Sequence, residues 1–182
     1  MSESNALRHD LNAIEVLNTV LQICGKGVYT LVLLMSTEKR VAIGRLGVFV
    51  FAQGVYTYTG SALGKGDAGL RRRIKRHLAK DKKQTWHIDY LLSEKDVKVQ
   101  AVIAARTRRR IECRMNQLLK ERFQARTPVH GFGSSDCKEM CGSHLLQLVS
   151  EVPVPKIAEL YLEETEGQIL VVDLLRKDKG KA

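Results

Sequence analysis

The sequence feature that most constrains the fold is a short, strongly apolar stretch that runs from Val28 to Met35. Gly27 precedes this stretch, and a polar turn at 36–39 follows it. A membrane-spanning helix needs roughly 20 apolar residues, so the stretch is far too short to cross a bilayer. Its length and its glycine and turn boundaries are typical of a buried β-strand.

Strand and helix patterns alternate along the rest of the chain. β-branched and aromatic residues predict a hairpin and two more strands, at 41–43 with 48–51, at 55–59 and at 97–105. Apolar spacing predicts helices at 6–23, 67–80, 86–92 and 107–123, and we expect Thr107 to cap the last of them. Between and beyond these elements we expect a glycine-rich loop at 60–69, a long loop at 127–142 and a C-terminal hairpin made by 157–162 and 168–174.

These elements predict one α/β domain, because 182 residues are too few for two ordinary domains. We expect a small central, mainly antiparallel sheet that is flanked by helices. The predicted divisions are an N-terminal helical extension at 1–26, the main domain at 27–149, and a C-terminal extension at 150–182 that ends in a frayed basic tail.

The charge balance indicates a polyanionic partner. The chain has 30 Lys and Arg against 20 Asp and Glu, for a net charge of +10. We therefore expect it to bind DNA, with RNA as the open alternative, and we expect no membrane partner. The N-terminus lacks the order of a secretory signal, which predicts a cytoplasmic protein whose four cysteines are free thiols or metal ligands.

Basic side chains concentrate in two places that we interpret as a phosphate-contacting surface. The first group lies on and after the predicted helix at 67–80 and comprises Arg71, Arg72, Lys75, Arg76, Lys80, Lys82 and Lys83. The second group, Arg108 and Arg109, lies at the start of the next long helix. Such a surface releases counterions when it binds nucleic acid. The alternative is a solvated face without a partner.

Two polar side chains of the helix at 67–80 are predicted to point inward. At about 100° per residue, Leu70, Ile74 and Leu78 form the buried stripe. Arg73 and His77 fall at the inner edge of this stripe, whereas the other basic residues face solvent. On the next long helix Glu112 lies at the border of the buried face, where a carboxylate is a metal ligand, a partner for an arginine such as Arg73, or a surface residue.

The order of these residues resembles the GIY-YIG nuclease superfamily. Gly27-Val28-Tyr29 opens one strand and Tyr58-Thr59-Gly60 ends a later one. A helix with Arg73 and His77 and a helix with Glu112 follow in the family's order. The segments Gly60 to Gly64, Trp86 to Tyr90 and Gly131-Phe132-Gly133-Ser134-Ser135-Asp136-Cys137 resemble a little-characterised, mostly prokaryotic branch of this superfamily.

The resemblance implies a metal-dependent endonuclease that hydrolyses phosphodiester bonds in DNA. It implies that Tyr29 is the general base, that Tyr58 positions water or phosphate, and that Glu112 holds one Mg²⁺ or Mn²⁺ ion. Arg73 would supply fixed positive charge to the phosphate and His77 would assist proton transfer. Because related domains are joined to base-excision repair enzymes, the resemblance also implies structured or damaged DNA as substrate and a repair protein as partner.

The sequence departs from the family pattern after the Glu112 helix. Many members carry an asparagine in the following loop, whereas Asn116 lies within the predicted helix itself. Ser135 or Asp136 could take that role, and the alternative is a branch that has lost full activity.

His87, in the Trp86 to Tyr90 segment, has two interpretations. It either extends the active site or has only a structural packing role.

Cysteine and histidine gather in the long loop. Cys137, Cys141 and His144, with His130 or Asp136 nearby, have the composition of a zinc site. Their spacing is irregular and a fourth ligand is not evident, so ordering of the loop beside the active site is the favoured interpretation.

Two other functions of the chain remain open. One is a non-catalytic nucleic-acid-binding module with the nuclease fold, and the other is a scaffold that binds a protein partner.

Overall fold

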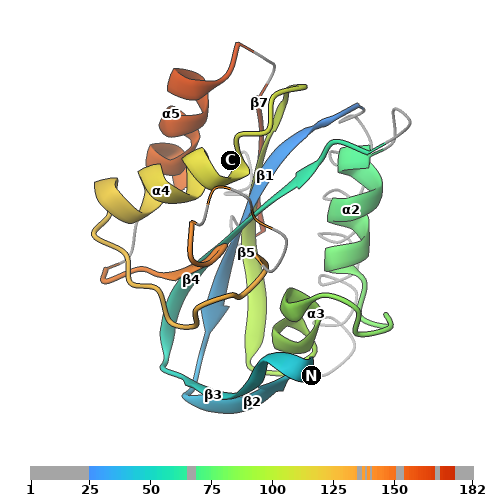
Figure 1. Ribbon diagram of the computed structural model, residues 1–182, viewed down its shortest axis with the longest axis vertical. Coiled ribbons are helices and arrows are strands. Elements are labelled where there is room, and N and C mark those ends of the chain that lie inside the picture. The colour runs from blue at the N-terminus through green and yellow to red at the C-terminus, as the bar shows by residue number, and fades with distance from the viewer. Residues whose placement is uncertain are drawn as a thin grey trace, which may run out of the picture.

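The computed structural model describes residues 25–64, 69–134, 137, 139, 141–150, 154–166 and 169–174. The helix expected at 6–23 and the basic C-terminal tail lie outside these residues. Within the described part the predicted fold class is confirmed, because a mainly antiparallel central sheet is flanked by helices (Figure 1).

Five strands form the central sheet in the order β6-β4-β1-β5-β7, and every neighbouring pair is antiparallel. Their bounds are β1 (Gly27–Met35), β4 (Gly54–Ala62), β5 (Val97–Arg106), β6 (Leu145–Gln147) and β7 (Ile169–Asp173). The predicted hairpin is also present, as β2 (Lys39–Ile43) and β3 (Gly47–Phe51) around the 3₁₀ turn η1 (Gly44–Leu46).

Strand β1 lies in the middle of the sheet and is buried on both faces. Tyr29, Leu31 and Leu33 point to one face, and Val28 and Val32 point to the other. This follows from the alternation of side chains along a strand, which in β1 places apolar residues at both sets of positions. The apolar stretch that is predicted to be a buried strand therefore forms β1, the most deeply buried strand of the central sheet.

Helices cover the two faces of the sheet (Figure 1). The helices α2 (Gly69–Leu78) and α3 (His87–Leu92) pack on the face that carries Tyr29. On the opposite face lie α4 (Glu112–Arg122) and α5 (Val154–Glu164), which contact each other. Leu70 and Ile74 of the stripe expected on α2 have no exposed surface, and Leu78 is partly buried. On α4, Met115 and Leu119 have no exposed surface.

Two predictions about element bounds are wrong. The helix expected from Thr107 begins only at Glu112, and the Thr107 hydroxyl instead accepts a hydrogen bond from the Arg109 amide. The C-terminal hairpin is absent, because its first half forms helix α5 and its second half forms β7 at the edge of the central sheet. The Ile157 to Leu162 stretch is apolar at helical as well as at strand spacing, and burial against α4 and the sheet selects the helix.

None of the described helices has the length and apolarity required to pass through a bilayer.

Candidate functional site

The site is built around a register in which Tyr29 of β1 lies opposite Gly60 of β4. A Cβ atom added at Gly60 would lie 2.5 Å from the Tyr29 hydroxyl oxygen and 2.7 Å from the ring carbon that bears it. Since real Cβ contacts are not this short, the Tyr29 side chain crosses the sheet surface in the space that Gly60 leaves free. The two glycine-and-tyrosine motifs of the sequence thus meet in one place.

The Tyr29 hydroxyl forms a hydrogen bond with Nε2 of His77, at 2.7 Å. Tyr29 has no exposed surface and His77 is 2% exposed. Burial lowers the pKa of His77 to about 3 and raises the pKa of Tyr29 well above its usual value, so both groups are uncharged at neutral pH. We call this unit the Tyr29–His77 pair.

Arg73 lies beside this pair and is partly exposed. Its guanidinium acts to lower the Tyr29 pKa, but burial of Tyr29 has the larger effect and raises it. The same guanidinium lies 4.6 Å from the centre of the Trp86 ring, and the Trp86 and His77 ring centres are 5.5 Å apart. Stacking on an aromatic face orients an arginine without using its N–H groups, so these groups can hydrogen-bond the Tyr29 hydroxyl or an anion.

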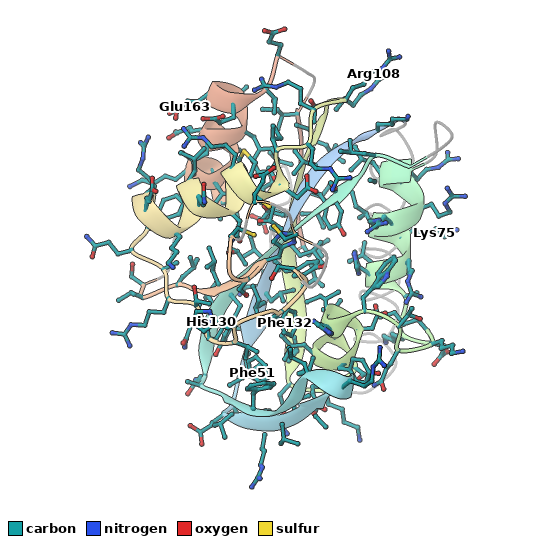
Figure 2. The ribbon with its side chains drawn as sticks, viewed as in Figure 1. Phe51, Lys75, Arg108, His130, Phe132 and Glu163 are labelled. Atoms are coloured by element: carbon teal, nitrogen blue, oxygen red, sulfur yellow. The ribbon has the colours of Figure 1, made fainter. Side chains whose placement is uncertain are left out.

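Tyr58 lies next to the same histidine, with 6.0 Å between the two ring centres and an edge-on arrangement. The loop after α4 covers Tyr58 from the other side: Phe132 contacts its ring, and a Cβ atom at Gly133 would lie 2.9 Å from it. Figure 2 shows Phe132 pointing from this loop toward the sheet. The loop predicted to be functional is thus packed directly on the site.

His87 holds this loop from the side of α3. Its Nδ1 accepts a hydrogen bond from the Gly133 amide at 3.1 Å, and its ring contacts Phe132. Burial lowers the pKa of His87, which favours the neutral ring that can accept this bond. Of the two roles left open by the sequence, the contacts support loop packing.

Glu112 is the first residue of α4 and is 8% exposed. Its Oε2 atom is buried and has no hydrogen-bond partner among the described residues. A buried carboxylate oxygen without a partner is energetically costly, so its presence requires a reason outside the packing of the helix. Among the interpretations of Glu112, a metal ligand fits this environment, and an ion pair with Arg73 is not observed.

Glu112 connects to the tyrosines through its neighbour in the chain. The Cys113 sulfur lies 3.5 Å from Nε2 of His144, and the His144 carbonyl accepts a hydrogen bond from the Thr59 amide, next to Tyr58. Tyr29, Tyr58, Arg73 and His77 are therefore linked by direct contacts. Glu112 is linked to these four residues through the contacts of its neighbour Cys113 with His144.

Asn116 was not predicted to be a site residue, although its position could have identified it. It lies one helical turn after Glu112, is 1% exposed, and donates a hydrogen bond from Nδ2 to the Ser143 carbonyl at 2.6 Å. Its Oδ1 atom is buried without a hydrogen-bond partner among the described residues, like Oε2 of Glu112. The i, i+4 spacing that places both side chains on one face of a helix was the available signal.

Cys137, Cys141 and His144 come together as the sequence suggested, and Cys113 of α4 joins them. The potential ligand atoms of these four side chains all lie within 4.8 Å of one another. We call them the Cys₃His cluster. Cys113 was not predicted to belong to this group because it lies 24 residues before Cys137 in the sequence. His130 is exposed, and Ser135 and Asp136 lie outside the described residues.

The predicted basic surface divides into exposed and internally bonded residues. Arg76 pairs with the buried Asp89 carboxylate and stacks on Trp86, and Lys82 donates to the carbonyls of His77 and Ala79 at the end of α2. Arg71 is partly exposed, and the remaining predicted positions are exposed, namely Arg72, Lys75, Lys80, Lys83, Arg108 and Arg109. Lys75 and Arg108 project away from the body of the molecule (Figure 2).

A family model described as "Domain of unknown function DUF123" matches residues 28–166, which is more than half of the chain. No curated protein and no solved structure matches the chain. The matched range runs from β1 to the end of α5 and so includes every site residue described above.

Proposed function

The chain belongs to the family described as Domain of unknown function DUF123, and from its site we propose that it is a GIY-YIG-type, metal-dependent endonuclease that hydrolyses phosphodiester bonds in DNA. The observation that carries this proposal is the convergence of Tyr29, Tyr58, Arg73 and His77 from two strands and a helix. Two tyrosines, a histidine and an arginine in contact provide proton transfer and anion binding at one place.

Glu112 is the residue that we assign to the catalytic cation. The partnerless Oε2 atom suits a hard divalent ion such as Mg²⁺ or Mn²⁺, which prefers oxygen ligands. Mg²⁺ commonly uses one or two carboxylates and completes its coordination with water and phosphate oxygens. A bound ion would supply charge neutralisation at the phosphate and a lower pKa for water.

Arg73 is assigned to the scissile phosphate. Arg73 is partly exposed, and stacking on the Trp86 ring fixes the plane of its guanidinium. Arg73 is therefore the first of the four clustered side chains that an incoming phosphate would contact. Its forked N–H groups match two phosphate oxygens, and its charge cannot be titrated near neutral pH.

The Tyr29–His77 pair is assigned to the proton of the attacking water. A phenol with a raised pKa is a poor base by itself, but its oxygen can accept a proton when its own proton passes to Nε2 of His77. The low pKa of His77 opposes this transfer. The negative charge of a bound phosphodiester acts in the other direction and favours the imidazolium.

Exposed positive charge on α2 supports a nucleic-acid substrate. Arg72 and Lys75 are exposed on the same helix that carries Arg73 and His77, so their charges would attract a nucleic-acid backbone to this helix. DNA, and structured or damaged DNA handled together with a repair protein, remains the prediction derived from the family resemblance.

The decisive assay incubates the full chain with plasmid and structured DNA oligonucleotides, with Mg²⁺ or Mn²⁺ and with EDTA. We expect nicking that requires the metal and that is lost in Arg73→Ala and in Glu112→Gln. Arg122→Ala is the matched control, since this exposed arginine lies at the far end of α4 and should leave nicking unchanged. Equal nicking by all variants would assign the activity to a contaminant.

A non-catalytic nucleic-acid-binding module is the second candidate, and one observation favours it. Tyr29 has no exposed surface, and Tyr58 is 7% exposed, so a substrate can touch either phenol only if the side chains that cover it move. Salt-sensitive DNA binding without cleavage, under every metal condition of the assay, would select this module over the enzyme.

A further inference from the structure

A second group of side chains, apart from the Tyr29–His77 pair, has the composition and spacing of a metal centre. The Cys113 sulfur lies 3.1 Å from that of Cys137 and 3.5 Å from Nε2 of His144, and the sulfurs of Cys137 and Cys141 are 3.3 Å apart. Four ligands at zinc–sulfur and zinc–nitrogen bond lengths form a tetrahedron with edges of about 3.6–3.8 Å. The four ligand atoms therefore already lie near the corners of such a site.

Disulfide bonds do not explain this arrangement. A disulfide requires sulfurs about 2 Å apart, and the three cysteines are free thiols. A bond between any two of them would leave the third thiol and the histidine unexplained. A single soft, tetrahedral cation accounts for all four ligands at once.

The backbone around the cluster is held in place independently of any metal. Ser143, next to His144, accepts the hydrogen bond from Asn116, and its hydroxyl bonds with the amide and carbonyl of Leu145. The His144 amide donates to Phe132 and its carbonyl accepts from Thr59.

The four ligands come from a helix, from a loop and from the residue before a strand. Cys113 lies in the first turn of α4, His144 directly precedes β6, and Cys137 and Cys141 belong to the loop between them. A closed set of four protein ligands leaves no position for substrate, which is the property of structural rather than catalytic zinc sites. An ion here would fasten the loop that covers Tyr58 to the helix that begins with Glu112.

We propose that the Cys₃His cluster binds one structural Zn²⁺ ion, which clamps the loop at 131–144 onto the N-terminal turn of α4. This proposal does not depend on the proposed nuclease activity. The ion positions Glu112 and the loop that packs on Tyr58, but it takes part in no bond making or breaking.

The test measures metal in the purified full chain after removal of any affinity tag. We expect one zinc per chain by elemental analysis, and after exchange with Co²⁺ an absorption spectrum with the sulfur-to-cobalt charge transfer and intense visible bands of tetrahedral thiolate coordination. Cys137→Ser and Cys141→Ser should reduce the zinc content at least tenfold. His130→Ala, an exposed histidine of the same loop, is the matched control and should retain the ion.

Two results would overturn the proposal. The first is a folded wild-type chain that contains no zinc and gives no tetrahedral cobalt spectrum. The second is zinc that stays at one per chain in both cysteine variants. If a cysteine variant fails to fold, the wild-type cobalt spectrum still decides the question, and iron in place of zinc would refute the assignment of the ion.

Discussion

The hydroxyl of Tyr29 and Nε2 of His77 lie 2.7 Å apart in the buried layer between β1 and α2, and both groups are uncharged there. A second buried phenol, Tyr161, forms a comparable hydrogen bond of 2.8 Å with Thr30 in the layer beneath α5. The two bonds lie on opposite faces of the same strand, so one can serve as the control for the other.

Tyr29→Phe is expected to separate activity from stability when it is compared with Tyr161→Phe. Each variant removes one buried hydroxyl and should lower the free energy of unfolding by about 1–3 kcal/mol. Only Tyr29→Phe removes a group of the proposed proton path, so it alone should lower the cleavage rate, by roughly two orders of magnitude. Urea titration and single-turnover cleavage measure the two effects, and equal loss of cleavage in both variants would contradict the assignment of Tyr29.

His77 should make the stability of the fold depend on pH. Its folded pKa of about 3 lies below the usual value of 6.5, because burial outweighs the opposing charge of Asp89 and is reinforced by Lys82, Arg73 and Arg76. Below pH 6.5 the unfolded state binds a proton that the folded state does not, so this contribution is complete above pH 6.5 and is lost as the pH falls toward 3.

The size of this dependence can be measured between pH 7 and pH 5. One group that is protonated only in the unfolded state changes the free energy of unfolding by at most about 1.4 kcal/mol per pH unit. Urea titrations should give a shallower slope for His77→Gln than for wild type, and the exposed control His130→Gln should leave the slope unchanged. Identical slopes for wild type and His77→Gln would mean that His77 titrates normally in the folded chain.

Glu112→Gln should abolish stabilisation of the fold by Mg²⁺. A ligand that binds only the folded state at ten times its dissociation constant adds about 1.4 kcal/mol, which is visible as a rise in the thermal midpoint. Wild type and Glu121→Gln, an exposed acid of the same helix, should show this rise. Without Mg²⁺ we expect Glu112→Gln to be no less stable than wild type, since it replaces a carboxylate whose Oε2 atom is buried with no hydrogen-bond partner among the described residues. A full Mg²⁺ response in Glu112→Gln would place the cation elsewhere.

Lys75→Ala should weaken DNA binding in a manner that depends on salt. Removing one phosphate contact reduces the slope of log affinity against log salt by about 0.9. Lys120→Ala removes an equal, exposed charge from α4 on the other face of the sheet, so its slope should match wild type. Fluorescence anisotropy over a range of salt concentrations distinguishes the two, and equal slopes for all three proteins would exclude α2 as the binding face.

Val172→Asp should destabilise the fold far more than Val171→Asp. Both residues belong to β7, but Val172 is 6% exposed against the sheet whereas Val171 is 42% exposed. A carboxylate forced into the buried position should lower the free energy of unfolding by roughly 3 kcal/mol, and one at the neighbouring position by less than about 0.5 kcal/mol. Equally small effects would show that β7 contributes little to the stability of the fold.

Local patterns were sufficient for most elements of the fold. The apolar run that became β1, the hairpin of β2 and β3 and the inward faces of α2 and α4 follow from the period of side chains along a strand or helix. The inward positions of Arg73 and His77 were predicted in the same way. The start of α4 and the C-terminal hairpin were not predicted correctly, because their boundaries depend on packing against segments that are distant in sequence.

The sequence by itself determined which chemical groups are present and on which face of each element they lie, because these follow from residue type and helical or strand period. Only the tertiary structure decided which groups meet. The antiparallel register that sets Tyr29 opposite Gly60, the approach of Cys113 to a loop more than twenty residues later, and the burial that raises the Tyr29 pKa rather than lowering it are properties of long-range packing. Desolvation and distance depend on neighbours from the whole chain, and no local pattern contains them.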